Sequence, residues 1–231
     1  MRLLKLLLFS LIFGQVYAQT TPYLDPLVPF NYGLRELYGS HYLNKDWNKG
    51  KIVLKQKGKL KKYNPLDVRY NLAHQNLEVK FKNVVSGKEY VKIFNEILLQ
   101  RFEYQNTKTK RIERFERCKN FNTGTSMIGF FKILYQGKKV QLLASLTSYE
   151  QKRLQFLKLG FISYDERVIH KAVYYMTKGG KTYKIKRRRK FILDQFDDRR
   201  KEVKAYAKAN KLFYKSEEDL TAIFKYYDGL K

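Results

Sequence analysis

Residues 168–196, VIHKAVYYMTKGGKTYKIKRRRKFILDQF, contain the change of periodicity that decides the fold. Up to Lys186, apolar and polar residues alternate on both sides of Gly179-Gly180, which is typical of two antiparallel strands joined by a tight turn. This turn predicts that three residues of the first strand face two of the second: Val173, Tyr175 and Thr177 opposite Thr182 and Lys184. After the basic run, apolar residues recur at helical spacing. The stretch therefore predicts an α+β fold, with a sheet followed by helices.

The preceding chain repeats the strand pattern. From Lys51 onward, segments of five to nine residues alternate or run apolar: KIVLK, VRYNL, LEVKF, EILLQRFEY, RIERFERC, IGFFKILY and KVQLLASL. Glycine tolerates the positive φ of tight turns, so three further turn signals favour antiparallel neighbours: Lys57-Gly58, Ser86-Gly87 and Gln136-Gly137. Residues 147–170 fit a capped helix, a strand or a loop, and we favour strand or loop. We expect residues 51–186 to form an antiparallel β meander or a barrel-like sheet.

The C-terminal part, residues 187–231, predicts two short amphipathic helices packed on the same unit. Four apolar residues within 188–211 fall on one helical face: Ile192, Phe196, Val203 and Ala207. Asn210 is a stop signal. Ser216 followed by three acidic residues is typical of a helix N-terminus. A second apolar stripe follows it: Leu220, Ile223, Phe224 and Tyr227.

The first 18 residues, MRLLKLLLFSLIFGQVYA, have the features of a cleaved signal peptide. Arg2 and Lys5 form a charged region before a short apolar core, and Val16 and Ala18 are the small residues before the cut. The core is shorter than the roughly 20 residues that a membrane-spanning helix needs. We therefore expect export, no transmembrane span and a mature chain that begins near Gln19. Residues 19–50, which are rich in proline, predict an extended arm around the edge of the domain.

Charge is the most unusual property of the composition. The chain has 48 Lys and Arg against 21 Asp and Glu, a net charge of +27, and loss of residues 1–18 would leave +25. Such a charge attracts polyanions over a Debye length of about 8 Å at physiological salt. Hydrophobic residues make up 44% of the chain, which predicts a packed core. The single cysteine, Cys118, cannot form an intrachain disulfide, and we favour a buried structural thiol over a reactive or intermolecular one.

The sequence contains no recognisable catalytic, cofactor or metal motif. His41, His74 and His170 lie far apart in the sequence, outside any metal-ligand spacing. The carboxylate pair Asp197-Asp198 and the acidic residues 217–219 fit helix ends, where they serve capping and charge balance. We therefore predict no catalytic, cofactor or metal site and a protein that is not an enzyme.

The candidate functional residues lie around the predicted junction of strand and helix, and all are cations: Lys184, Lys186, Arg187, Arg188, Arg189 and Lys190. Cations near a helix N-terminus are mildly unfavourable for the helix dipole, which favours an anion-binding role. The alternative is a solvated basic edge that prevents strand aggregation. Nearby tyrosines also fit a nucleic-acid surface, but export removes the chain from intracellular nucleic acid.

Three segments carry a resemblance: GSHYLNKDWNKGKIVLKQKG, NPLDVRYNLAHQNLEVKF and KEVKAYAKANKLFYKSEEDLTAIFKYYDGL. Together with the signal peptide, they resemble a β-rich family of exported proteins from Bacteroidetes. The matching positions are Tyr42, Leu43, Trp47, Gly50, Pro65, Leu66, Arg69, Tyr70, Asn71, Asn210, residues 217–220, Tyr226 and Tyr227. This chain departs from the pattern at Asp67 and in its high content of cations. The resemblance implies a non-enzymatic protein of the cell envelope and supplies no ligand or catalytic residue.

We therefore expect an exported binding or structural module, located in the periplasm, at the outer membrane or outside the cell. Its expected partner is an anionic envelope polymer, a lipid headgroup or an acidic envelope protein. Two alternatives stay open: an accessory subunit of an outer-membrane export or assembly machine, and an envelope hydrolase or nuclease with an unrecognised site. An enzyme should gather histidines and acids in a concave pocket, whereas a binding module should show a convex basic face.

Overall fold

The computed structural model describes residues 37–156 and 162–230. The predicted signal peptide and residues 19–36 of the predicted arm lie outside the described residues. One sheet contains all the strands: β1 (Leu37–Tyr38), β2 (Asn48–Gln56), β3 (Lys59–Asn71), β4 (Asn76–Lys82), β5 (Glu89–Phe94), β6 (Leu99–Gln105), β7 (Ile112–Arg117), β8 (Phe130–Gln136), β9 (Val140–Phe156), β10 (Ile162–Lys178) and β11 (Lys181–Ile185). A short 3-10 helix (Cys118–Asn120) follows β7, and the described α-helices come after the last strand: α1 (Arg189–Asp194), α2 (Arg200–Ala209) and α3 (Glu217–Gly229).

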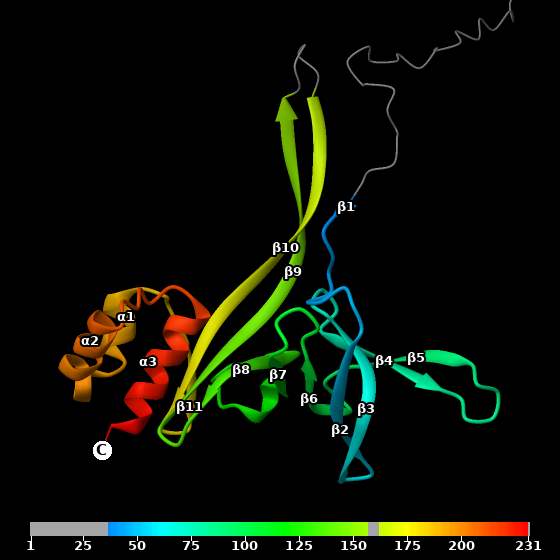
Figure 1. Ribbon diagram of the computed structural model, residues 1–231, viewed down its shortest axis with the longest axis horizontal. Coiled ribbons are helices and arrows are strands. Elements are labelled where there is room, and N and C mark those ends of the chain that lie inside the picture. The colour runs from blue at the N-terminus through cyan, green and yellow to red at the C-terminus, as the bar shows by residue number, and fades with distance from the viewer. Residues whose placement is uncertain (1–36, 157–161, 231) are drawn as a thin grey trace, which may run out of the picture.

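The predicted α+β class with an antiparallel sheet is confirmed (Figure 1). The strand order is β1-β10-β9-β8-β7-β6-β2-β3-β4-β5, and β11 also pairs with β10. Among the described strands, the two ends of this order do not pair, so the sheet is open and is not a closed barrel. The order departs from a simple meander at two points, because β6 pairs with β2 instead of β5, and β1 pairs with β10 instead of β2.

The four predicted glycine turns each join antiparallel neighbours: β2 to β3, β4 to β5, β8 to β9 and β10 to β11. Across the last turn Tyr175 pairs with Lys184 and Thr177 with Thr182, as predicted. Val173 lies beyond the end of β11 and pairs with Ser145 of β9. The hairpin register is therefore set by the Gly179-Gly180 turn, where both residues have positive φ.

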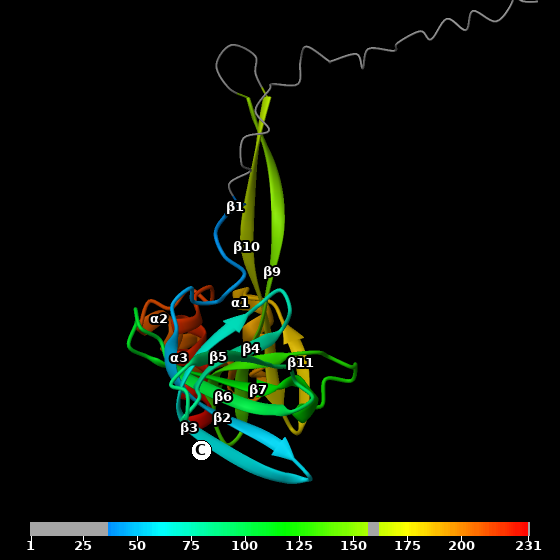
Figure 2. The same cartoon turned by 90° about the vertical axis from the view of Figure 1, so that its right-hand side faces the viewer.

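The segment whose structure the sequence left open, residues 147–170, lies in strands except for residues 157–161, which are outside the described part of the chain. β9 and β10 are each 17 residues long and pair along their whole length. Figure 2 shows that their far halves stand out of the body as a narrow ribbon, with β1 beside it. β1 pairs with β10 in parallel, through Leu37 opposite Glu166 and Tyr38 opposite Arg167.

The main core is lined by one face of the sheet, from β2 to β11, and by the helices at one end of it. Alternation along the strands directs Phe130, Leu142 and Tyr174 into this core, whereas Phe131 and Leu143 join a smaller cluster on the opposite face. The helices cover the sheet at the end that contains β8 to β11 (Figure 1). All the apolar residues of the two predicted helical stripes are buried: Ile192, Phe196, Val203, Ala207, Leu220, Ile223, Phe224 and Tyr227.

The prediction of a single helix across residues 188–211 is wrong, because the segment is split into α1, a 3-10 turn (Asp197–Arg199) and α2. The break is stabilised by tertiary contacts of Asp198, whose carboxylate accepts hydrogen bonds from Tyr227 Oη at 3.0 Å and Lys178 Nζ at 3.4 Å. Periodicity cannot detect this break, because Phe196 and Val203 are seven residues apart and fall on one face of an uninterrupted helix too. The predicted end at Asn210 and the Ser216 cap are confirmed, and Ser216 Oγ accepts from the Asp219 amide at 3.0 Å.

Candidate functional site

The basic run lies where the sequence predicted it, at the junction between a strand and a helix. β11 ends at Ile185 and α1 begins at Arg189, with Arg188 as its N-cap residue. Ile185 and Ile192 are buried, whereas residues 186–190 are exposed. Three of these cations and one distant residue line one hollow, which we call the basic hollow: Lys186, Arg187, Arg188 and Lys215. Lys215 could not be predicted from the sequence; it lies in the connection between α2 and α3 and lines the hollow from there.

Arg187 fixes the shape of the basic hollow. Its Nη1 donates to the main-chain oxygen of Lys215 at 2.6 Å, and its guanidinium carbon lies 4.6 Å from the centroid of the Tyr174 ring. Tyr174 in turn donates to Glu217 Oε1 at 3.2 Å. Burial and then the charge of Glu217 raise the pKa of Tyr174 to about 12, although Arg187 opposes the rise. Arg187 therefore connects the strand β10 with the segment that leads into α3.

The other predicted cations have different surroundings. Lys186 Nζ lies 4.8 Å from the centroid of the Phe191 ring. Arg189 interacts with Tyr214, whose pKa is raised by burial against the opposing charge and hydrogen bond of Arg189. Lys184 pairs with Tyr175, which packs on the smaller core cluster, so Lys184 lies on the opposite face from the basic hollow. The structure therefore groups Lys186, Arg187 and Arg188 with Lys215 and separates Lys184 from them.

The charge around the basic hollow is poorly balanced by acids. Residues 186–215 contain twelve Lys and Arg but four Asp and Glu. Three of these acids are engaged by other cations: Asp194 by Arg200 at 2.5 Å, Asp198 by Lys178 at 3.4 Å, and Glu202 by Arg199 at 3.0 Å. Within the described part of the chain, no ion pair involves Lys186, Arg188 or Lys215. These three side chains are available for an external anion, and Arg188 offers a planar fork that holds paired oxygens.

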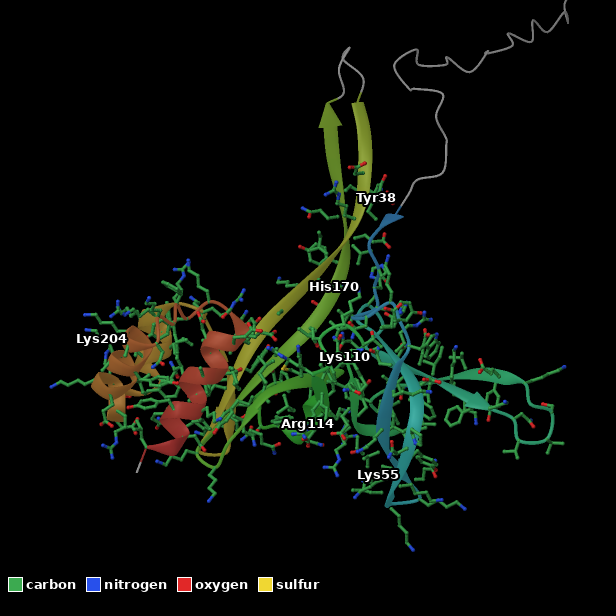
Figure 3. The ribbon with its side chains drawn as sticks, in the orientation of Figure 1. Tyr38, Lys55, Lys110, Arg114, His170 and Lys204 are labelled. Carbon is green, nitrogen blue, oxygen red and sulfur yellow. The ribbon has the colours of Figure 1, made fainter. Side chains whose placement is uncertain are left out.

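A second constellation joins the N-terminal segment to the β9–β10 ribbon. His41 Nδ1 lies 2.9 Å from Ser148 Oγ, and His41 Nε2 lies 3.1 Å from Glu150 Oε1. His170 Nε2 lies 2.7 Å from the main-chain oxygen of Ser40 (Figure 3). His41 and His170 therefore both link the N-terminal segment to the β9–β10 strand pair. His74 lies elsewhere, in the turn between β3 and β4. These residues line neither of the two hollows described for this chain.

A third cluster contains residues that carry the family resemblance. The guanidinium of Arg69 lies over two rings, 3.8 Å from the centroid of Tyr42 and 4.7 Å from that of Trp47. Glu78 accepts from Arg69 Nη2 at 2.7 Å and from Tyr42 Oη at 2.6 Å. This cluster attaches the segment before β2 to the outer face of β3 and β4.

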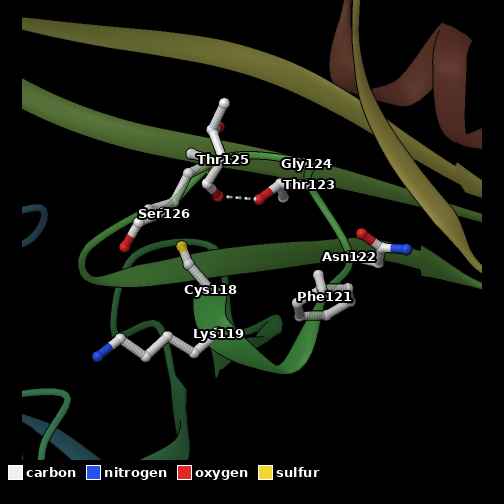
Figure 4. A pocket seen from close by; sticks show the side chains of 9 residues that line it. Cys118, Lys119, Phe121, Asn122, Thr123, Gly124, Thr125 and Ser126 are labelled. Atoms are coloured by element: carbon white, nitrogen blue, oxygen red, sulfur yellow. Dashed lines mark hydrogen bonds between the residues drawn. The ribbon is translucent and has the colours of Figure 1, made fainter.

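Cys118 is buried, which confirms its predicted structural environment. It lies beside a hollow formed by the loop of residues 121–127, as Figure 4 shows. Burial, followed by the charge of Glu96, raises the pKa of the Cys118 thiol to about 12. The thiol is therefore protonated at neutral pH, when thiols are weak nucleophiles.

Residues 37–156 and 162–230 were compared with the requirements of a metal site and of a membrane-spanning helix. No group of three or more His, Cys, Asp or Glu side chains there is placed to hold a metal ion. Of the helices in that part of the chain, none combines the length and apolarity that a bilayer crossing requires.

Comparisons with protein-family models, curated proteins and solved structures found no match to the chain.

Proposed function

We propose that the protein is an exported, non-enzymatic binding module that holds an anionic surface of the cell envelope in its basic hollow. The observation that carries the proposal is the grouping of Lys186, Arg188 and Lys215 without acidic partners, while Asp194, Glu202 and Asp198 of the same region are engaged elsewhere. The signal peptide predicted for residues 1–18 and the resemblance to exported proteins of Bacteroidetes support an envelope location. N-terminal sequencing of the envelope form should find a chain that starts near Gln19.

The chemistry of the basic hollow favours a ligand with clustered oxyanions. Two flexible ammonium groups and one guanidinium fork can surround a phosphate or carboxylate group, and each adds a charge-assisted hydrogen bond. Phosphate groups of lipid headgroups and of anionic envelope polymers have this chemistry. An acidic face of an envelope protein is the alternative partner.

The proposal is tested by a hollow variant, Lys186→Gln with Arg188→Gln and Lys215→Gln. Arg187 and Arg189 are left unchanged, because Arg187 contacts Tyr174 and the Lys215 main chain, and Arg189 interacts with Tyr214. Exposed charges contribute little to stability, so the variant should unfold at nearly the wild-type temperature. It should co-sediment with outer-membrane fragments much less than the wild type does at low salt, and the difference should shrink as salt screens the wild-type attraction.

The matched control is a distal variant, Lys55→Gln with Lys59→Gln and Lys61→Gln. It removes the same charge from exposed positions around the β2–β3 turn, away from the helices, where Figure 3 labels Lys55. The distal variant should co-sediment with outer-membrane fragments nearly as well as the wild type does. Equal attachment of the hollow variant and the wild type at every salt concentration would overturn the proposal.

A second candidate function is ester or amide hydrolysis at Ser148. A hydroxyl within reach of an imidazole that also contacts a carboxylate is the arrangement of a nucleophile, base and orienting acid, and His41 stands between Ser148 and Glu150 in this way. Hydrolysis of p-nitrophenyl acetate by the wild type, abolished in both Ser148→Ala and His41→Gln, would favour this function. Equal rates in wild type and variants would leave these residues with the role of attaching the N-terminal segment to the ribbon.

A further inference from the structure

The strand β5 forms an open edge of the sheet at the end opposite the helices. It pairs with β4 on one side, and no other described strand lies beside it. Five of its six residues are exposed, and Phe94 is partly buried. An edge strand presents unpaired main-chain groups and can accept an additional strand.

The turn before β5 determines which main-chain groups face the open side. The Asn83 amide donates to Lys88 O at 2.9 Å, and the Gly87 amide donates to Asn83 O at 2.9 Å. Hydrogen-bonded and non-hydrogen-bonded pairs alternate along an antiparallel ladder, so Tyr90 and Lys92 direct their main-chain groups toward β4. The amides and carbonyls of Glu89, Val91 and Ile93 consequently point away from β4, toward the open side.

The two faces of β5 carry different side chains. Val91 and Ile93 lie on one face and are 49% and 64% exposed. Tyr90 and Lys92 lie on the other face, where Lys92 Nζ is 5.6 Å from the ring centroids of both Tyr90 and Phe81. Lys88 and Lys92 have no ion pair among the described residues, whereas Glu89 is paired with Lys80 at 3.8 Å. A strand added here would meet Val91 and Ile93 beside the paired Glu89 on one face, and the unpaired Lys92 beside Tyr90 on the other.

The charges on β5 determine which kind of strand can pair with its open edge. Lys92 within β5 and Lys88 just before it discourage pairing with a second copy of the same cationic chain, and this chain carries a net charge of +27. The same lysines attract a strand with carboxylates at alternate positions, because cross-strand pairs of opposite charge stabilise a sheet. We propose that β5 is a docking edge for an extended segment of a partner protein in which acidic residues alternate with apolar ones. This inference concerns a surface separate from the basic hollow and does not depend on the function proposed for it.

The probe for this edge is a peptide of four Glu-Val repeats, blocked at both ends and labelled with a fluorophore, and the matched control is four Lys-Val repeats. The acidic peptide should bind the full chain, and it should protect the amides of Glu89, Val91 and Ile93 from hydrogen exchange. The lysine peptide should not bind. In the hollow variant the acidic peptide should still protect the amides of Glu89, Val91 and Ile93, which separates this edge from the basic hollow.

Two variants test the edge itself. Val91→Pro removes an amide on the open side without removing a hydrogen bond to β4, and it should weaken acidic-peptide binding about tenfold. Lys88→Glu with Lys92→Glu keeps the main chain and should reverse the preference, so that the lysine peptide binds more tightly than the acidic one. The proposal is wrong if the acidic peptide does not bind, if the protected amides lie elsewhere, or if the charge-reversed variant keeps its preference for the acidic peptide. Dimerisation of the wild type through β5, seen by sedimentation and lost in Val91→Pro, would also overturn it.

Discussion

The side chains of Arg69 and Tyr42 stack, with the guanidinium carbon 3.8 Å from the ring centroid, and both contact Glu78. This contact joins the segment before β2 to the sheet. The Glu78 side chain is 13% exposed and the Arg69 side chain is 25% exposed, so solvent screens the pair less than it screens a surface ion pair. The pair and the ring form one structural unit.

Arg69→Gln should therefore lower the free energy of unfolding by about 2 kcal/mol, because Glu78 loses its charged partner in a poorly solvated place. The control is Arg114→Gln, which breaks the more exposed ion pair between Arg114 and Glu103. That change should cost less than about 1 kcal/mol. Urea unfolding of both variants measures the difference, and equal losses would show that the Arg69 cluster adds nothing beyond a surface ion pair.

The helices should depend on the contact between Phe196 and Phe224. Both rings are fully buried, and their centroids are 5.2 Å apart in an edge-to-face arrangement. Phe196→Ala and Phe224→Ala should each destabilise the protein by roughly 3 to 5 kcal/mol. Phe213→Ala, at a ring that is 73% exposed, is the control and should change stability little. Unchanged thermal midpoints for both core variants would mean that the helices are not packed on the sheet.

Asp228 should make stability depend on acid pH. Burial by itself would raise the pKa of this carboxyl, but the amides of Lys139, Lys138 and Val140 and the Tyr135 hydroxyl lower it overall. A carboxyl whose pKa is lower in the folded state stabilises the fold above its unfolded pKa, about 3.9. This contribution is lost as the pH falls through the folded pKa.

Asp228→Asn should accordingly be less stable than the wild type at neutral pH. The difference in stability between the two proteins should disappear as the pH falls below about 4. Asp46→Asn, at an exposed position, controls for the loss of one negative charge. Thermal unfolding as a function of pH gives both curves. A difference in unfolding temperature that stays constant down to the lowest pH measured would contradict the role assigned to the Asp228 carboxylate.

Cys118 should be inert in the folded protein. Its thiol is buried, and its pKa is raised to about 12, so little thiolate is present at pH 8. Ellman's reagent should react slowly with the native chain and rapidly after unfolding in guanidinium. Fast stoichiometric reaction of the native protein would show that the thiol is accessible and would favour the reactive alternative.

The features of the fold that could be predicted are those determined by local sequence. Glycine turns fixed the pairing of Tyr175 with Lys184, and helical spacing identified Phe196 and Phe224 as core residues. The features that could not be predicted depend on contacts distant in sequence. The pairing of β6 with β2, the break at Asp198 and the arrival of Lys215 at the basic hollow leave no periodic signal, because each is set by tertiary packing.

In the candidate site, too, the features set by local sequence could be predicted and those set by contacts distant in sequence could not. The junction of β11 and α1 could be located from the alternating strand and the basic run that follows it. The sequence could not show that Lys184 lies on the other face or that Arg187 has a structural contact with Tyr174. Likewise, the meeting of His41 with Ser148 and Glu150 joins residues more than a hundred positions apart, and sequence spacing cannot indicate it.

Binding to phospholipid vesicles that contain phosphatidylglycerol, measured over a range of salt concentrations, tests the central claim most directly. Each cation near an anionic surface contributes roughly 1 kcal/mol, so the hollow variant should bind about 3 kcal/mol more weakly than the wild type at low salt. The distal variant should lose much less, and the three proteins should converge as salt rises. Equal weakening of the hollow and distal variants would contradict the account, because the attraction would then come from net charge and not from the basic hollow.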